Sequence, residues 1–154
     1  MRAIDLDRDG NKELFMTIFT GGVHCCFVFV AARLENDTFI PLDTIMGGHA
    51  EFEITDIDKD SIKEIKGANT SYAYAFASFV DSYYPVQIFQ FKKNKFVDVT
   101  HLFPQEVKKD MAETKNYWKI LYRRNWRGKN MLALQMRMTK IGSATILHYI
   151  TRIK

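Results

Sequence analysis

Two acidic stretches of this chain align without a gap: IDLDRDGNKEL at Ile4–Leu14 and TDIDKDSIKEI at Thr55–Ile65. They lie 51 residues apart, and in both of them three Asp residues alternate with other residues before a Glu four positions further on. Self-similarity at a fixed offset is typical of repeated structural units. We therefore expect two equivalent units, and we work outward from these stretches.

The sequence after each acidic stretch also corresponds. Residues 26–30 and 38–42 of the first unit match residues 85–91 and 96–99 of the second, and all contain runs of apolar residues. Apolar residues that alternate with others predict half-buried strands. Asn36-Asp37 and Lys93-Asn94 supply the residues that a hairpin turn needs. Each unit is thus predicted to be an acidic loop, a strand, a connection and a β-hairpin.

The pattern changes after Pro104. Residues 106–124 lack Gly and Pro and carry apolar residues at spacings of three or four, which predicts a helix from about Pro104 to near Asn125. Residues 130–138 and 144–153 resemble a closing strand pair. We expect one mainly β domain over residues 1–154: a repeat over about 3–53, a second over about 54–103, then the helix and strand pair.

Composition narrows the class of protein. The chain has 154 residues, of which 47% are hydrophobic and 14% aromatic, enough to bury a core and too many for a disordered chain. Its longest apolar run, Cys25–Ala32, is too short to cross a bilayer, and no signal-peptide pattern follows Met1. Residues 1–70 carry a net charge of −6 and residues 71–154 one of +10. The acidic half favours cations, and the basic half favours phosphates, acidic proteins or the acidic half itself.

The first acidic stretch has the composition of a metal-binding loop. Asp5, Asp7 and Asp9 occupy positions 1, 3 and 5, and Glu13 occupies position 9. Four carboxylates this close repel one another unless a cation lies among them, and Ca²⁺ accepts six to eight oxygens in irregular geometry. Gly10 permits the sharp turn. We expect a calcium site here, with the backbone carbonyl of Asn11 as a further ligand.

The second stretch keeps the four carboxylates of the first but has Ser61 in place of Gly10. If this position needs a positive φ, Ser costs about 1 kcal/mol more than Gly, so weaker calcium binding is expected. Neither loop is an EF-hand, because position 12 is Met16 in one and Gly67 in the other. An alternative remains open for both loops, in which the Asp side chains only form side-chain-to-backbone turns.

An acidic loop of this form that leads into a strand and a hairpin resembles the calcium loop of FG-GAP and VCBS repeats, the blades of integrin-type β-propellers. The resemblance covers about residues 3–103, and the segment at 20–26 also resembles one found in many uncharacterised bacterial proteins, often secreted or periplasmic. The resemblance to FG-GAP and VCBS repeats implies metal ligands at Asp5, Asp7, Asp9, Asn11 and Glu13, and at Asp56, Asp58, Asp60, Ile62 and Glu64. Two units cannot close a propeller, so the repeats are expected to form an open, blade-like pair.

Three interpretations of the Gly21–Cys26 segment stay open. Cys25 and Cys26 are small apolar strand residues, or they form a disulfide, or one thiolate acts with a histidine as a nucleophile or metal ligand. The third interpretation would make the protein a cysteine/histidine-dependent enzyme. A basic, aromatic stretch at 115–129 offers another alternative, the binding of nucleic acid or an anionic surface.

We conclude from the sequence that a non-enzymatic, calcium-binding β-repeat module is the favoured interpretation. The calcium is expected to be mainly structural and the partner to be a protein or a glycan, with nucleic acid less favoured. An oligomer is compatible with the sequence. The family resemblance favours a periplasmic or secreted location.

Overall fold

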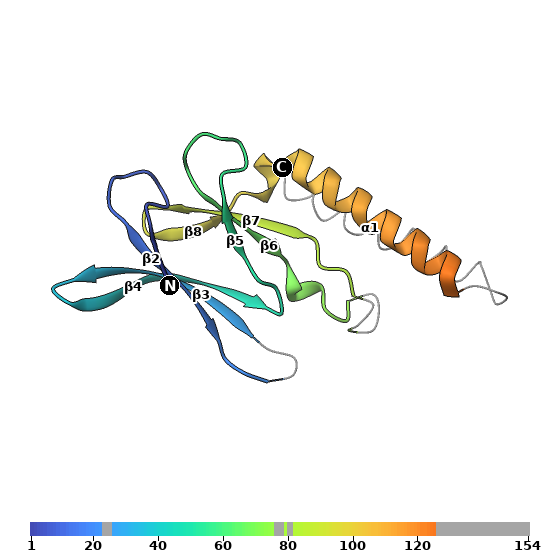
Figure 1. The fold of residues 1–154 in the computed structure, drawn as a ribbon, viewed down its shortest axis with the longest axis horizontal. Coiled ribbons are helices and arrows are strands. Elements are labelled where there is room, and N and C mark those ends of the chain that lie inside the picture. Colours follow the sequence, from blue (N-terminus) through green and yellow to red (C-terminus); the bar gives the residue numbers. More distant parts are fainter. Residues whose placement is uncertain (23–25, 76–78, 80–81, 126–154) are drawn as a thin grey trace.

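A computed structural model of the protein describes residues 1–22, 26–75, 79 and 82–125. The described chain forms two four-stranded antiparallel sheets followed by a long helix, α1 (Pro104–Asn125) (Figure 1). The prediction of a mainly β protein with one helix starting at Pro104 is confirmed. The strand pair predicted at 130–138 and 144–153 lies outside the described residues.

Both sheets are simple meanders in which strands that are neighbours in sequence are neighbours in space. The first sheet consists of β1 (Arg2–Ile4), β2 (Glu13–Phe19), β3 (Phe27–Glu35) and β4 (Thr38–Gly48). The second consists of β5 (Glu53–Thr55), β6 (Glu64–Ala68), β7 (Val86–Lys92) and β8 (Lys95–Asp98), with a short 3₁₀ turn, η1 (Thr70–Tyr72), between β6 and β7. A second 3₁₀ turn, η3 (Thr100–Leu102), leads into α1.

The two sheets have the same register around their acidic loops. Ile4 pairs with Glu13 across β1 and β2, and Thr55 pairs with Glu64 across β5 and β6. Each acidic loop is therefore the connection of a hairpin, not a segment that only precedes a strand. The short strands β1 and β5 were not predicted, since three residues are too few to show an alternating pattern.

The hairpin tips have the turn chemistry that the sequence predicts. Asn36 and Asp37 have φ values of 48° and 59°, and Lys93 and Asn94 have values of 52° and 62°. Two successive residues with positive φ are the mark of the type I′ turn, whose twist matches that of the flanking strands.

The main core lies between the two sheets. The face of the first sheet that points into it, which we call its inner face, carries Phe15, Phe29 and Ile45. Opposite them lie Ile65 and Phe91 of the second sheet, both 0% exposed. The two sheets thus pack face to face and share one hydrophobic core.

The other face of the second sheet is covered by the C-terminal elements. Val86 and Ile88 of β7 pack with Val99 and Phe103, and Val107 of α1 lies against this cluster. Two polar links hold the helix start in place: Lys66 pairs with Glu106 at 2.7 Å, and the backbone N–H of Val86 donates to the Asp110 carboxylate.

The layers follow in the order first sheet, second sheet, α1 (Figure 1). Among the described residues, no helix has the length and hydropathy needed to span a membrane.

Candidate metal centres

Each acidic loop is folded by hydrogen bonds between its own carboxylates and its own backbone. The Oδ2 atom of Asp5 accepts from Gly10 N at 3.1 Å, and the Oδ2 atom of Asp56 accepts from Ser61 N at 3.1 Å. Position 6 has a positive φ in both loops, 90° at Gly10 and 76° at Ser61. The condition under which Ser61 was expected to be strained is therefore met.

The glutamate at position 9 closes each loop from inside the protein. Glu13 and Glu64 begin β2 and β6 and are both 0% exposed. Their Oε2 atoms accept from the backbone N–H of position 2, at 3.1 Å from Leu6 N and at 2.8 Å from Ile57 N. A buried carboxylate thus links the start of each loop to the strand that follows it.

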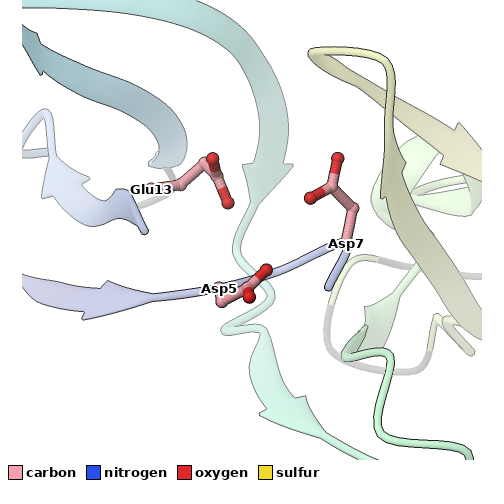
Figure 2. Close-up of side chains that lie close together, drawn as sticks. All are labelled: Asp5, Asp7 and Glu13. Carbon is pink, nitrogen blue, oxygen red and sulfur yellow. The ribbon is translucent and has the colours of Figure 1, made fainter. Parts of the chain in front are cut away.

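Three carboxylates converge in each loop. One oxygen each of Asp5, Asp7 and Glu13 lies within 4.8 Å of the others, and Figure 2 shows these groups facing a common space. The second loop brings together its equivalents in the same way: Asp56, Asp58 and Glu64. These are six of the residues that the sequence predicts as ligands, and oxygen atoms at this spacing suit a hard divalent cation.

Three of the converging Asp side chains each have one carboxylate oxygen that makes no hydrogen bond. The Oδ1 atoms of Asp5, Asp7 and Asp56 are buried from solvent and have no hydrogen-bond partner in the structure. Leaving a buried carboxylate oxygen unsatisfied costs free energy. A cation among these oxygens removes that cost, so the residues present fit a metal ion.

The aspartates at position 5 play a different part. Asp9 accepts from Asn11 N at 2.7 Å, and Asp60 accepts from Ile62 N at 2.8 Å, while both residues are exposed. The hydrogen bond from Asn11 holds the pKa of Asp9 below its ordinary value. The structure therefore groups three of the four predicted carboxylates in each loop and uses the fourth for a turn. Coordination by the carbonyls of Asn11 and Ile62 stays a prediction.

The two centres differ in the side chain that reaches the buried glutamate from the next strand. In the first repeat Arg33 Nη2 lies 3.4 Å from Glu13 Oε1, and in the second Gln90 Nε2 donates to Glu64 Oε1 at 2.7 Å. Burial raises the pKa of Glu13, although its hydrogen bonds with Leu6 and Arg33 act in the opposite direction. A cation bound beside Glu13 would favour the ionised carboxylate and so oppose the rise in pKa that burial causes.

A lysine already neutralises part of the second centre. Lys63 Nζ lies 3.0 Å from Asp56 Oδ2, and this hydrogen bond holds the pKa of Asp56 below its ordinary value. The equivalent residue in the first loop is Lys12, which forms no ion pair within the described part of the chain. A metal ion in the second loop would compete with this internal cation.

The two loops also touch each other. Lys63 N donates to the carbonyl of Leu6 at 3.3 Å, and Arg8 Nη1 donates to the carbonyl of Asp60 at 3.3 Å. Leu6 itself is fully buried in the core between the sheets. The two loops are therefore hydrogen-bonded to each other, and the first loop is anchored in the core through Leu6.

The remaining sequence candidates find less support. Cys26 takes part in a disulfide, so it offers no thiolate for the enzyme alternative, and His24 and Cys25 lie outside the described residues. In the basic stretch at 115–129, Lys115, Tyr117 and Lys119 are exposed on α1. Residues 126–129 lie outside the described chain.

Comparisons of the chain with family models, with curated proteins and with solved structures give no match. The class of protein is therefore defined by the fold and the two sites: a β protein with two stacked, equivalent sheets, each carrying a carboxylate cluster at one hairpin connection.

Proposed function

We propose that this protein is a calcium-binding β-repeat module in which each sheet is comparable to a propeller blade and each acidic loop takes up one Ca²⁺ ion. The observation that carries the proposal is a matched pair of atoms. Asp5 Oδ1 and Asp56 Oδ1 occupy equivalent positions and are both buried without a partner, beside equivalent carboxylates. Oxygen ligands of this kind are those that Ca²⁺ accepts.

The position of the clusters supports a structural role for the ion. Asp5 directly follows β1, and Glu13 is the first residue of β2. An ion between them would fasten the two strands at the point where the loop leaves the sheet. Because Glu13 also holds Leu6, which is in the core, the ion would stabilise the packing of both sheets.

The first loop should bind calcium more tightly than the second. In the second loop the ion must displace the Lys63 ammonium from Asp56, and Ser61 holds a strained positive φ. In the first loop, position 6 is a glycine. Arg33 reduces this difference, since its charge lies beside Glu13.

The resemblance to FG-GAP and VCBS repeats supports a binding role toward a protein or a glycan rather than catalysis. It also supports a location outside the cytoplasm, where extracellular modules bind calcium with a Kd of about 10⁻⁴ to 10⁻³ M. In this proposal the sheets present the binding surface and the ions keep it folded.

Thermal unfolding with and without calcium tests the proposal. An ion that binds the folded state alone at about 100 times its Kd adds about 2.7 kcal/mol, so Tm should rise by several degrees in calcium relative to chelator. Asp5→Asn should remove most of the rise and Asp56→Asn a smaller part. Asp37→Asn, at an exposed hairpin tip, is the control and should leave the rise unchanged.

Calorimetric titration of the wild-type chain separates calcium from other ions. We expect two calcium sites of unequal affinity and weaker binding of Mg²⁺, which demands near-octahedral geometry. Equal melting temperatures in calcium and chelator, together with no heat of calcium binding, would contradict the proposal.

A further inference from the structure

Positive charge accumulates along α1 and the sequence that follows it. The last acidic residue in the sequence is Glu113, and residues 114–154 carry ten Lys or Arg and no Asp or Glu. Two of these ten, Lys115 and Lys119, are exposed on α1, as are Lys108 and Lys109 about two turns earlier. Long runs of one sign of charge repel themselves and are typical of segments that meet oppositely charged partners.

The acidic side chains of α1 act on the second sheet. Glu106 pairs with Lys66 at 2.7 Å, and the Asp110 carboxylate accepts from the backbone N–H of Val86. The hydrogen bond to Glu106 and, more weakly, the charge of Glu113 hold the pKa of Lys66 above its ordinary value. The carboxylates of the helix are thus engaged on the side that packs against the protein.

Three lysines form a row on the opposite side of α1, which we call the lysine row: Lys108, Lys115 and Lys119. At about 100° per residue they lie within about 40° of one another, opposite to the helix residues that contact the second sheet, and they span about 16 Å. All three are exposed, and none forms an ion pair within the described residues. Lys115 and Lys119 are four residues apart, where like charges destabilise a helix. An anionic surface along the row would relieve this repulsion.

The lysine row lies on the outermost layer of the molecule. α1 packs on the second sheet, and the first sheet with its acidic loop lies on the far side of the second (Figure 1). A flat surface that contacts the row therefore meets the helix before either sheet. Packed sheets are about 10 Å apart and exposed charges are screened over about 8 Å at physiological salt, so the carboxylates of the first loop weaken this contact little.

We propose that the lysine row of α1 is a docking surface for an anionic phospholipid bilayer. The ammonium group of lysine is a compact point charge on a flexible stem, which suits phosphate groups that are not held in one fixed geometry. Val107, on the apolar side of the helix start, already packs against the second sheet. The helix therefore lies on the lipid headgroups rather than among the acyl chains, and its attachment is electrostatic. The proposal goes beyond the calcium sites and does not rest on them.

The composition of this side of the helix favours a lipid surface over nucleic acid. Beside the lysines, its described part carries Gln105, Ala112 and Asn116, all of them exposed. This part of the helix therefore offers no aromatic ring on which a base could stack and no arginine that could read a base edge. A straight row of lysines on an outermost layer also matches a flat surface better than it matches a curved duplex.

Co-sedimentation of the whole chain with lipid vesicles, in calcium, tests the proposal. Vesicles of phosphatidylcholine with about 30% phosphatidylserine should bind the chain at about 0.05 M salt and release it at about 0.5 M, and phosphatidylcholine alone should not bind it. A lysine near an anionic surface contributes about fivefold to binding, so a double variant with Lys115→Gln and Lys119→Gln should bind about thirtyfold more weakly.

A second double variant, Lys92→Gln with Lys93→Gln, is the matched control. It removes the same charge from exposed positions at the β7–β8 hairpin, where Lys95 pairs with Asp43 of the first sheet, far from the lysine row. Its binding should fall by at most about threefold, since only the net charge of the protein changes. All four lysines are exposed, so both double variants should melt as the wild type does.

Three results would overturn the proposal. The first is a wild type that does not bind the phosphatidylserine vesicles at low salt. The second is binding that both double variants weaken equally, or that neither weakens, because net charge or calcium bridging between an acidic loop and a lipid then explains it. The third is a random-sequence DNA duplex that binds more tightly than the vesicles, compared per accessible anionic group, and loses affinity when Lys115 and Lys119 are changed. That result would assign the lysine row to nucleic acid.

Discussion

Position 6 is one of the positions at which the two acidic loops differ. Ser61 has a φ of 76° where the first loop has Gly10 at 90°. Side chains destabilise this conformation because of the clash of Cβ with the backbone. We predict that Ser61→Gly raises the free energy of unfolding by about 1 kcal/mol, measured by urea denaturation in chelator.

The reverse substitution is the matched control. A Cβ at Gly10 would meet no atom within 4 Å, so Gly10→Ser tests conformation without a steric clash. It should lower the free energy of unfolding by about 1 kcal/mol. A Gly10→Ser variant as stable as the wild type would mean that the positive φ costs nothing in these loops.

The buried carboxylate of Glu13 should make the calcium-free protein sensitive to pH. Burial raises the pKa of Glu13, so the folded state holds this proton more tightly than the unfolded state does. The stability that this group contributes is complete below the ordinary glutamate pKa and is lost as the pH rises through the raised value. We predict that Glu13→Gln, which cannot ionise, flattens the fall in unfolding free energy over this window.

Urea denaturation in chelator at a series of pH values, from about 4 to about 8, measures this slope. Glu35→Gln, at an exposed position on the first hairpin, should leave the slope as in the wild type. The slope, rather than the absolute stability, is the readout, because the amide also changes the hydrogen bonds with Leu6 and Arg33. Parallel slopes for wild type and Glu13→Gln would count against the pKa direction.

At the scale of elements, the hairpin tips carry strain that glycine relieves. Asp37 is the second residue of a type I′ turn and has a φ of 59°. Glycine is favoured at this position. Asp37→Gly should therefore raise the free energy of unfolding by about 0.5 to 1 kcal/mol.

Thr38→Gly is the control, because Thr38 begins β4 and is extended. Glycine weakens a strand, so this variant should lose about 0.5 to 1 kcal/mol. Denaturation of both variants with one probe gives the comparison. If both variants changed the free energy of unfolding in the same direction, the turn geometry at Asp37 would not explain the effect of glycine.

The sequence predicts those features of the structure that depend on residues close together along the chain. The hairpins β3–β4 and β7–β8 could be predicted because alternation and turn residues are local. The site could be predicted as far as its carboxylates, because their spacing keeps them together in any tight turn. That Asp9 and Asp60 lie outside the clusters could not be predicted, because sequence spacing does not determine where a carboxylate points.

The partners of the buried glutamates could not be predicted either. Arg33 lies 20 residues from Glu13 in sequence, and Gln90 lies 26 residues from Glu64. Each arrives from the neighbouring strand, so its position depends on strand register. An alignment of the two hairpins by register is the signal that identifies them.

At the scale of the whole molecule, one core joins the two repeats. Phe29 is 1% exposed, and its ring lies 5.0 Å from that of Phe52, which precedes the second sheet. We predict that Phe29→Ala lowers the free energy of unfolding by about 3 to 5 kcal/mol. Hydrogen exchange should show reduced protection in both sheets, not in the first alone.

Phe19→Ala removes the same atoms from a residue that is 59% exposed on the same sheet, and it should cost less than about 1 kcal/mol. Loss of protection confined to β1–β4 in the Phe29→Ala variant would show that the repeats unfold separately.

The stacking of the sheets is directional. The first sheet packs on the second through its inner face, whereas the second sheet contributes the face that carries Ile65 and Phe89. The equivalents of these two residues in the first sheet lie on the opposite face, so the two sheets stack head to tail. A head-to-tail stack of sheets has two different ends, and Phe103 and Val107 cover the end formed by the second sheet. Among the described residues, a further unit of the same kind could consequently be placed before β1 without altering a contact between the two sheets, whereas one inserted before α1 would have to displace that closure.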